Sequence, residues 1–444
     1  MTKQELVNYL ELLLQKTFPN INHIEVALSG GIDSICLLHL LSHLSTKCGF
    51  LLSATHINHQ ISKHSNYWED FCHQICDSLN IPITSTKVIV NLNGGNGLEA
   101  EARKVRYEVF KQSKANVLAL AHHSDDQSET VLLQLLRGGS PKGLAAMPKV
   151  RKLNNKNNTQ LWRPLLNITR TQLEKIALEE GWVWIDDDSN TNTQFKRNFL
   201  RHNVMPILLK EYPDYKNQFM RASQHAADAA DILSEVADTD LKILLIDDRT
   251  INLDILTTLS PARQRNAIVT WLCKFNINTN PKKIDDILTQ LLSSVNSSIP
   301  KFILKDWILT RYQQHAILLK KFTMPNEDIK IKFSPENLII DIPEWCGKLH
   351  FKPTNNGINY STICDNLSVR RRMGGEIVYH NGVNKTLKNV LQEAKIPPYR
   401  RERTPLLYSN NTILAMPGLF INTKLLSTRS ETGYIPIWIP YDGY

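Results

Sequence analysis

The segment HIEVALSGGIDSICLLHLL, residues 23–41, constrains the fold more than any other part of the sequence. It places two glycines and two serines between an apolar strand pattern and an apolar helix pattern. Backbone amides at such a turn, together with the positive end of the helix dipole, bind phosphate. The patterns GxxxxGK[ST] and GxGxxG do not occur here, which excludes the usual nucleoside-triphosphatase and dinucleotide sites. Asp33 adds a carboxylate suited to Mg²⁺.

The region from Ile24 to about Val150 alternates between short apolar runs and helical patterns, which predicts a doubly wound parallel α/β sheet. The predicted strands are Ile24–Leu28, Leu51–Asn58, Ile83–Val90 and Val117–Ala121. The predicted helices lie near Ile35–Leu44, Asn66–Leu79 and Leu98–Lys114. The polar, asparagine-rich stretch 151–160 predicts a loop between ordered elements.

The length of 444 residues predicts two or three domains. Helical spacing dominates residues 216–292, shorter strand-like runs follow, and a basic mixed module begins at Leu367. We therefore expect an N-terminal α/β domain over 1–213, a mainly helical middle domain over 214–330 and a small α+β domain over 331–444.

Composition excludes several other classes of protein. No run of about 18 apolar residues could span a bilayer, and the N-terminus predicts an amphipathic helix without a signal-peptide core. We therefore expect a cytoplasmic protein with no membrane partner. The seven cysteines include no CxxC pair, so neither a disulfide framework nor a zinc ribbon is indicated. The net charge of +9 suggests attraction to a polyanion such as nucleic acid.

A second cluster, AHHSDDQSETVLLQLLRGGSPKGLAAM, follows the strand that ends at Ala121 and so lies at the ligand-binding edge of the sheet. Asp126 and Glu129, at i and i+3 of a helix, can face one pocket. The alternative is that these acids only cap the helix, and for Asp125 the two interpretations stay equally open. A zinc site is weaker, because the cluster offers no closed ligand set.

Two further segments carry arginines at helical spacing. In WIDDDSNTNTQFKRNFLRHNVMP, Arg197 and Arg201 lie one turn apart and can present guanidinium groups to phosphate or nucleic acid. In GLEAEARKVRYEVF, Arg103 and Arg106 lie at i and i+3 near Glu99. Solvated surface arginines are the alternative for the first pair, and surface ion pairing for the second.

Together these segments resemble the tRNA(Ile)-lysidine synthetase family of the PP-loop ATP-pyrophosphatase superfamily. Residues 29–34 match SGGxDS, HHSDDQSET matches HHxDDQxET, and KTLKNVLQEAKIPPYRRERTPLLY is similar to the family's C-terminal tRNA-binding domain. The family's DxSNxxxxxxRNxxR pattern is matched by Asp187, Ser189, Asn190, Arg197, Asn198 and Arg201. The likeness runs from the first strand through the C-terminal module.

The resemblance implies a ligase that uses ATP and Mg²⁺. It would adenylate the C2 carbonyl of the wobble cytidine in the CAU anticodon of tRNA(Ile), and the ε-amine of L-lysine would then displace AMP. The product, lysidine, switches codon reading from AUG to AUA. By the same resemblance, domain 1–213 is catalytic and the other two bind tRNA. The oligomeric state stays open, with a homodimer among the alternatives.

The resemblance also assigns roles to individual residues. Asp33, Asp126, Glu129, Arg103 and Arg106 are the expected catalytic residues, with Mg²⁺ held by Asp33 and Asp126. ATP is expected to contact Ser29, Gly30, Gly31, Ile32, Asp33, Ser34 and His123. Substrate and tRNA contacts are expected from Asp187, Ser189, Asn190, Arg197, Asn198, Arg201, Lys385, Lys388, Arg400, Arg401 and Arg403.

The chain departs from the family's pattern in two places. Ser140 and Ala146 stand where relatives have glycine in RGxGxxGLxGM, which leaves the geometry of that loop in question. Met373, Gly374, Gly375 and Glu376 stand where a Pro-Gly-Asp turn is commoner.

Two rival functions follow from the same residues. A PP-loop tRNA thiolase needs sulfur chemistry from an iron–sulfur cluster or a persulfide cysteine, and the lack of CxxC argues against it. A non-catalytic, nucleotide-responsive RNA-binding protein is disfavoured because the acids expected to bind magnesium are all present.

Overall fold

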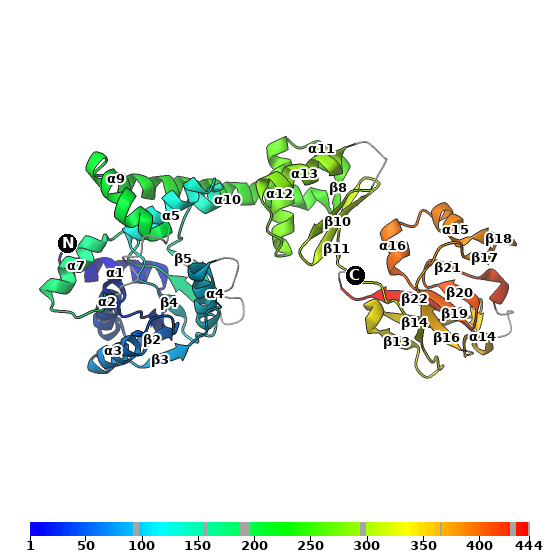
Figure 1. Ribbon diagram of the computed structural model, residues 1–444, viewed down its shortest axis with the longest axis horizontal. Coiled ribbons are helices and arrows are strands. Elements are labelled where there is room, and N and C mark those ends of the chain that lie inside the picture. The colour runs from blue at the N-terminus through cyan, green and yellow to red at the C-terminus, as the bar shows by residue number, and fades with distance from the viewer. Residues whose placement is uncertain are drawn as a thin grey trace. The chain divides into compact units, whose positions relative to one another are not determined.

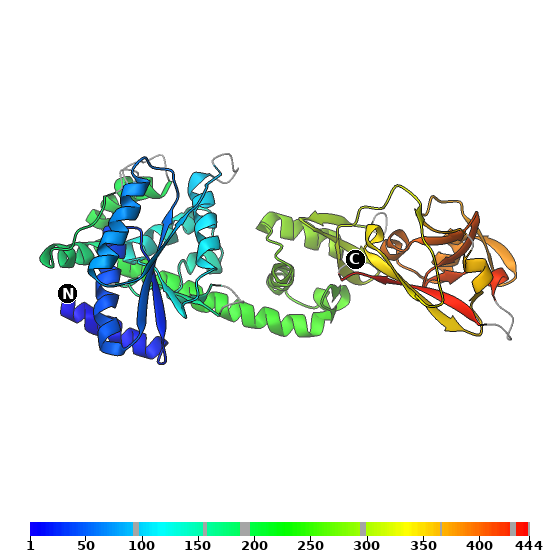
Figure 2. The same ribbon diagram turned by 90° about the horizontal axis from the view of Figure 1, so that it is seen from below.

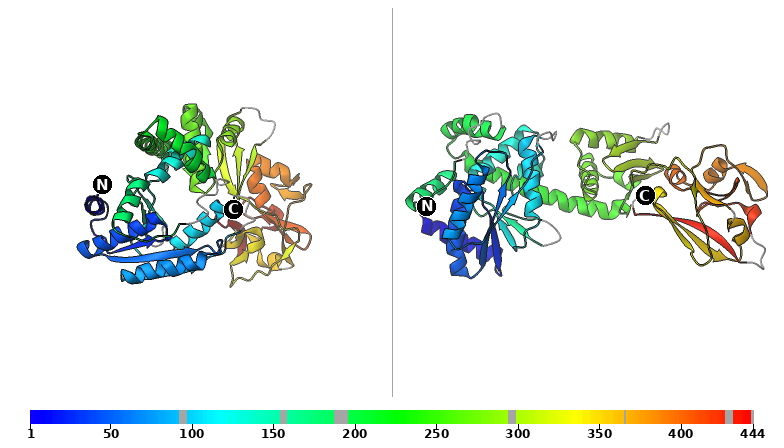
Figure 3. Two further views of the ribbon diagram at one scale, coloured as in Figure 1. Left: turned by 60° about the vertical axis from the view of Figure 1, so that its left-hand side comes forward. Right: turned by 60° about the horizontal axis from the view of Figure 1, so that its bottom comes forward.

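The computed structural model describes residues 1–91, 97–153, 158–186, 196–293, 299–364, 366–426 and 432–442. The chain divides into two compact units, Met1–Ile232 and Leu233–Tyr444 (Figure 1). The division falls inside the long helix α10 (Tyr215–Leu244), which is visible along its length in the right panel of Figure 3. The three-domain boundaries expected from the sequence stay a prediction.

The first unit is built on a sheet with the strand order β3-β2-β1-β4-β6-β5. Its strands are β1 (His23–Ala27), β2 (Leu51–Asn58), β3 (Ile83–Lys87), β4 (Val117–Ala119), β5 (Val150–Lys152) and β6 (Gln160–Trp162). The pairs are parallel except that between β5 and β6. This confirms the predicted parallel α/β sheet.

Helices cover both faces of this sheet, as Figure 2 shows for the blue strands of the first unit. The early helices are α1 (Lys3–Thr17), α2 (Ile32–Cys48), α3 (Ser65–Ser78) and α4 (Leu98–Phe110). The later ones are α5 (Ser124–Leu136), α6 (Pro141–Leu144), α7 (Arg170–Glu179), α8 (Lys196–Phe199) and α9 (Met205–Glu211). The main core lies between the sheet and α1, α2, α3 and α7, and a smaller core lies beneath α4 on the opposite face.

The predicted loop over residues 151–160 is wrong at both ends. Arg151 and Lys152 belong to β5, and Gln160 begins β6. Strand β5 lies at the sheet edge and its side chains are largely solvent-facing, so a polar composition is compatible with a strand there. Leu161 and Trp162 anchor the hairpin in the core. Residues 154–157 lie outside the described part of the chain.

The strand order changes direction beside β1. Helix α2 leads from β1 to β2 on one side, and the later chain returns to place β4 on the other. Crossovers that run to opposite sides leave an opening at the carboxyl ends of the two central strands. The segments after β1 and β4 carry the two clusters singled out in the sequence, so the fold places both at this opening.

The second unit begins with a helical part that also contains a sheet of order β7-β8-β11-β10-β9. Its helices after α10 are α11 (Leu253–Thr257), α12 (Pro261–Lys274) and α13 (Pro281–Leu292). Its strands are β7 (Leu245–Asp247), β8 (Thr250–Asn252), β9 (Lys301–Leu304), β10 (Trp307–Tyr312) and β11 (His315–Lys320). Trp271, Ile287 and Leu309 are central to its core.

The remainder is an α+β part with two sheets, of orders β12-β16-β19-β20-β21 and β13-β14-β22-β15, and a hairpin β17–β18. The first sheet contains β12 (Ile329–Lys330), β16 (Leu367–Arg370), β19 (Leu406–Ser409), β20 (Thr412–Met416) and β21 (Phe420–Ile421). The second contains β13 (Ile339–Ile342), β14 (Gly347–Thr354), β15 (Ile358–Asn359) and β22 (Gly433–Pro440). The others are β17 (Ile377–His380), β18 (Val383–Thr386), α14 (Tyr360–Cys364), α15 (Leu387–Glu393) and α16 (Pro398–Arg403).

Among the described residues, no helix is both long and apolar enough to cross a bilayer.

Ser140 and Ala146, which stand where the family's pattern has glycine in the loop after α5, are accommodated in different ways. The Ser140 hydroxyl accepts a hydrogen bond from the Gly143 amide at 3.4 Å and so caps α6. Ala146 has φ of 54°, in the left-handed region that costs an L-residue about 1–2 kcal/mol. Gly139 cannot be replaced, because a Cβ there would lie 2.8 Å from the Gln134 carbonyl oxygen.

We expect Ala146→Gly to raise the free energy of unfolding by about 1 kcal/mol, because glycine removes the left-handed strain. Ala145, next in the chain, has φ of −57° and is the matched control. Ala145→Gly should lower stability by about 0.5–1 kcal/mol. Thermal unfolding of both variants checks the prediction, and equal destabilisation by the two changes would contradict it.

Candidate active site

The turn between β1 and α2 is shaped by Gly30 and two serines. Gly30 has φ of 87°, and a Cβ there would lie 3.2 Å from Ile185 Cδ1 and 3.3 Å from Cys72 Sγ. The Ser29 and Ser34 hydroxyls lie 3.1 Å apart, and the Ser34 hydroxyl donates to the Gly31 carbonyl oxygen at 2.9 Å. These contacts fix the turn with the first amides of α2 directed toward the sheet opening.

The chain after α7 passes beside this turn. The Ile185 amide donates to the Gly30 carbonyl oxygen at 2.9 Å, and the Trp182 ring stacks on His39 at 4.5 Å. Asp187, Ser189 and Asn190, which were expected to contact substrate, lie outside the described residues.

Asp33 stands in the first turn of α2 with its carboxylate 28% exposed. Its Oδ1 atom is buried and accepts no hydrogen bond from any described residue. Burial raises the pKa of Asp33, and the opposing effects of His123 and Arg170 do not cancel this rise. A buried carboxylate oxygen without a donor is an energetic cost unless a cation or ligand meets it.

His123 joins the two sequence clusters. It caps α5, its backbone amide donates to Asp126 Oδ2 at 3.1 Å, and its ring is 2% exposed. Its Nε2 atom lies 3.6 Å from Asp33 Oδ1 and 3.4 Å from Asp126 Oδ2. The ring therefore links the carboxylate of the first motif to that of the second.

Asp126 and Glu129 form an ion cluster with Arg197 and Arg201. Arg197 donates to Glu129 Oε2 at 2.6 Å and to Asp126 Oδ1 at 2.8 Å. Arg201 donates to both Glu129 oxygens, at 2.6 and 3.1 Å, and reaches Asp126 Oδ1 at 3.4 Å. Four charges thus neutralise one another in a site where Glu129 is 1% exposed.

The cluster keeps the Asp126 carboxylate ionised. Burial alone would raise the pKa of Asp126, but His123 and Arg197 outweigh it and lower the pKa to about 2. Arg201 belongs to a π-helical turn, Leu200–Val204, between α8 and α9. Such one-turn irregularities re-aim side chains and occur often at functional sites. Both guanidinium groups face the carboxylates, while their predicted contact with tRNA stays a prediction.

Asp125 has partners on α7 and α10 that Asp126 does not have. It accepts a hydrogen bond from Lys216 Nζ and another, at 3.1 Å, from the Arg170 amide at the start of α7. Burial would raise the pKa of Asp125, but these two partners lower it. Asp125 therefore joins α5 to α7 and α10. No sequence pattern indicates that Lys216 reaches this site.

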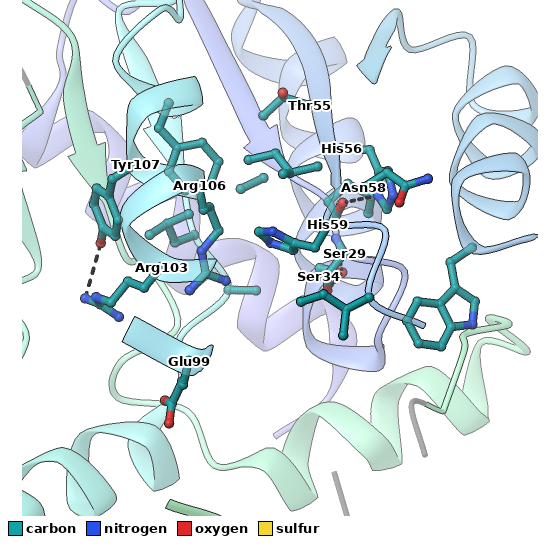
Figure 4. A pocket seen from close by; sticks show the side chains of 18 of the residues that line it. Ser29, Ser34, Thr55, His56, Asn58, His59, Glu99, Arg103, Arg106 and Tyr107 are labelled. Atoms are coloured by element: carbon teal, nitrogen blue, oxygen red, sulfur yellow. Dashed lines mark hydrogen bonds between the residues drawn. The ribbon is translucent and has the colours of Figure 1, made fainter. Parts of the chain in front are cut away.

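A cavity of about 750 Å³ opens beside the turn (Figure 4). Ser29, Asp33, Ser34, Asp126, Arg197 and Asn198 line it, as do Arg103 and Arg106 from α4. Glu129, Arg201 and His123 do not line it. The figure shows the Arg106 guanidinium beside the His59 ring. Among the described residues, that guanidinium has no hydrogen-bond or ion-pair partner.

Six further lining residues were not identified from the sequence: Thr55, His56, Asn58, His59, Trp68 and Tyr107. His122, which belongs to the second sequence cluster, lines the cavity as well. Thr55, His56, Asn58 and His59 lie at or just after the carboxyl end of β2, where polar residues replace the apolar ones of the strand. That position was the available signal, because neighbouring parallel strands end at one edge. The His56 ring donates through Nδ1 to the Leu28 carbonyl oxygen, 2.9 Å away, so Nδ1 carries the proton.

The cationic residues expected to bind tRNA in the second unit differ in their surroundings. Lys385 pairs with Glu393 at 3.0 Å, and Arg401 donates to the Ile396 carbonyl oxygen at 2.6 Å. Arg403 donates to the Lys320 carbonyl oxygen at 2.6 Å. Lys388 and Arg400 are exposed and have no ion-pair partner among the described residues.

The residues present fit a magnesium ion bound together with phosphate. No group of three or more His, Cys, Asp or Glu side chains in the described residues could hold a metal ion by itself. Mg²⁺ in phosphate sites takes one or two carboxylates and leaves its other positions to phosphate and water. The buried, donorless Oδ1 of Asp33 meets that requirement. Both Asp126 oxygens already have protein donors.

Comparison with known proteins matches both ends of the chain. A PP-loop domain model matches residues 2–208, and a model of the TilS substrate C-terminal domain matches residues 367–438. The tRNA(Ile)-lysidine synthase of Nitrosomonas europaea is 35% identical over 94% of this chain and 92% of its own. That of Coxiella burnetii is 37% identical over 92% of this chain and 91% of its own.

Among solved structures, the U34-tRNA thiolase NcsA from Methanococcus maripaludis is 19% identical, with a TM-score of 0.42 over 50% of this chain and 78% of its own.

We expect Asp33→Asn to stabilise the ligand-free protein at pH 7. Because the folded pKa of Asp33 lies above its unfolded value, burial of the charged form costs stability once the pH exceeds that folded pKa. Below the unfolded value of 3.8 the wild-type side chain is protonated in both states, so the advantage should disappear. Thermal unfolding at pH 7 and at low pH measures it.

Asp70→Asn, at an exposed position of α3, is the matched control and should leave stability unchanged within about 0.5 kcal/mol. A loss of stability in Asp33→Asn at pH 7 would show that burial of this charge is not costly.

Proposed function

The chain belongs to the tRNA(Ile)-lysidine synthase family, and from that premise we propose which residues of the cavity carry each step of the reaction. Its relatives are ligases that form a carbon–nitrogen bond. The observation that carries the proposal is the buried, donorless Asp33 oxygen beside a phosphate-binding turn, in a cavity that Asp126 and Arg197 of the ion cluster also line.

The reaction has two steps. In the first, the C2 carbonyl oxygen of the wobble cytidine in a CAU anticodon attacks the α-phosphorus of ATP, and the bond to pyrophosphate breaks. In the second, the lysine ε-nitrogen bonds to C2, the bond from C2 to that oxygen breaks, and AMP leaves. The ε-amine loses its protons as the new bond forms, and the product is lysidine. A tRNA that carries lysidine reads AUA in place of AUG.

The turn at residues 29–34 is proposed to hold the phosphates of ATP. Its backbone amides and the positive end of α2 supply hydrogen bonds and partial charge where the pyrophosphate leaves. Bound Mg²⁺ would neutralise charge on that leaving group. Asp33 is the residue proposed to hold it, with Asp126 as the second carboxylate beyond His123. The His123 ring, which lies near both carboxylates, would keep their separation fixed.

Of the two acids in the ion cluster, Asp126 is the one that an amine in the cavity can reach, because Glu129 does not line it. A carboxylate whose pKa is about 2 is a weak base. We therefore assign Asp126 the role of orienting a lysine amine and not of removing its proton. Glu129 holds Arg197 and Arg201 behind it.

Arg106 is proposed to meet an anionic or carbonyl oxygen of the substrate, because its guanidinium lies in the cavity without a protein partner among the described residues. Burial lowers the pKa of Arg106, and Arg103 lowers it further. Arg103 lies 3.4 Å from the Tyr107 hydroxyl. A buried cation without an anion favours binding of a negatively charged group.

The thiolase alternative lacks a sulfur group at this place. None of the residues that line the cavity is a cysteine, and burial raises the pKa of Cys72, behind the turn, to about 12. A thiol with so high a pKa is a poor nucleophile. We propose that the reaction takes place in the cytoplasm, because its substrate is a tRNA.

We expect Asp33→Ala to lower ATP-dependent lysine incorporation into tRNA(Ile) at least about 100-fold, because the leaving group loses its charge stabilisation. tRNA binding should stay within about twofold, since Asp33 belongs to the phosphate side of the cavity. Filter binding and radiolabelled lysine incorporation measure the two effects. Asp70→Ala is the control, and normal turnover by Asp33→Ala would contradict the assignment.

We expect the double change Lys388→Ala and Arg400→Ala to weaken tRNA binding and to reduce the slope of log K against log salt by roughly 1.5, the value for two lost phosphate contacts. A matched control replaces Lys16 and Lys114, exposed lysines of the first unit, and removes the same charge. Filter binding across a salt series distinguishes them. If the two double variants gave equal slopes, Lys388 and Arg400 of the second unit would not contact tRNA phosphates.

A further inference from the structure

His122 lies in the cavity wall but was given no separate role by the sequence. It follows β4 at the sheet opening, directly before the capping residue His123. Its Nδ1 atom lies 3.1 Å from Arg163 Nε. Among the described residues, its Nε2 atom has no hydrogen-bond partner. The part of the ring that remains available to a ligand is therefore Nε2.

Arg163 is held firmly in place behind this ring. It follows β6, the strand paired with β4, and its side chain is 2% exposed. Its Nη1 atom donates to the Pro148 carbonyl oxygen at 2.8 Å. The backbone of the two strand ends is joined as well, because the Leu120 amide donates to the Trp162 carbonyl oxygen at 2.8 Å. The guanidinium position is thus fixed by the sheet.

The contact with Arg163 determines the tautomer of His122. A guanidinium has donors only, so Nδ1 of the imidazole must accept and carries no proton. In the neutral ring the proton then resides on Nε2. Burial lowers the pKa of His122 to about 3, and Arg163, Arg197 and Arg106 add to this effect against Asp126. The ring is therefore neutral at physiological pH with its proton on Nε2, in a residue that lines the cavity.

We propose that Arg163 is a positioning residue that locks His122 in this tautomer, and that His122 Nε2–H donates a hydrogen bond to an acceptor oxygen of the bound substrate. The proposal rests on the proposed function, which supplies two such oxygens: an α-phosphate oxygen of ATP and the C2 carbonyl oxygen of cytidine. A neutral donor suits either one. It polarises or orients an oxygen without protonating the nucleophile and without repelling the lysine cation.

The first experiment compares His122→Gln with His122→Asn. The glutamine amide can place an N–H near the position of Nε2, whereas the shorter asparagine cannot. His122→Asn should lower kcat/KM for lysine incorporation about 100-fold, and His122→Gln no more than about tenfold. Equal activities for the two variants would overturn the donor role.

The Michaelis constants then identify the oxygen. A rise confined to the KM for ATP, or a loss of ATP–pyrophosphate exchange, assigns the α-phosphate. A rise confined to the KM for tRNA assigns the cytidine carbonyl. If His122→Asn leaves both Michaelis constants and kcat unchanged, the side chain makes no substrate contact and the proposal fails.

The positioning role of Arg163 requires a double-mutant cycle. Arg163→Met removes the donor, so the ring can change tautomer, and kcat/KM should fall about tenfold or more in the wild-type background. In the His122→Gln background the same change should cost less than about threefold, because an amide has no tautomer to lock. A merely structural arginine would cost the same in both backgrounds, and that result would overturn the proposal.

Arg163→Lys keeps a donor near Nδ1 and should restore part of the activity lost in Arg163→Met. Thermal unfolding shows whether each variant is folded. If Arg163→Met does not fold, the activity lost on Arg163→Lys is compared between the wild-type and His122→Gln backgrounds instead. Absence of lysine incorporation by the wild-type enzyme would refute the proposed function itself. The comparison among variants refutes only the role of His122 and Arg163.

Discussion

The ion cluster of Asp126, Glu129, Arg197 and Arg201 is the interaction on which the site depends. A buried carboxylate is expensive to ionise unless cations and hydrogen bonds compensate it. Here each carboxylate receives both arginines, at distances between 2.6 and 3.4 Å. The cluster therefore joins α5 to the π-helical turn and determines which acid faces the cavity. Removing one member would leave the charges of the others buried without full compensation.

The surroundings of two carboxylates in the same site shift their pKa values in opposite directions. Burial raises the pKa of Asp33, whose Oδ1 lacks a donor, whereas His123 and Arg197 outweigh burial at Asp126 and lower its pKa to about 2. Asp126 is already compensated by protein groups, while Asp33 gains most from a cation that arrives with substrate. Such a difference between neighbouring acids is a common basis for dividing roles between them.

The sequence predicts the features that local pattern controls. The parallel sheet and the turn at residues 29–34 both follow from motifs within a few residues. It does not predict contacts between distant segments, such as Arg163 with His122 across 41 positions or Lys216 with Asp125 across 91. Nor does it separate exposed cations from internally bonded ones: Arg400 is exposed, whereas Arg401 binds a backbone carbonyl oxygen. Only tertiary packing decides these cases.

The π-helical turn at Leu200–Val204 has a consequence for how this segment can vary. A π turn holds one residue more than a regular α-helical turn. A chain one residue shorter here would form a continuous α-helix with the helix beyond the turn kept near its present orientation. A residue inside the turn that follows the deletion would instead move by one helical position, about 100° around the axis. A deletion on the amino-terminal side of Arg201 would therefore turn its guanidinium away from Glu129, so the length of this turn is tied to the ion cluster.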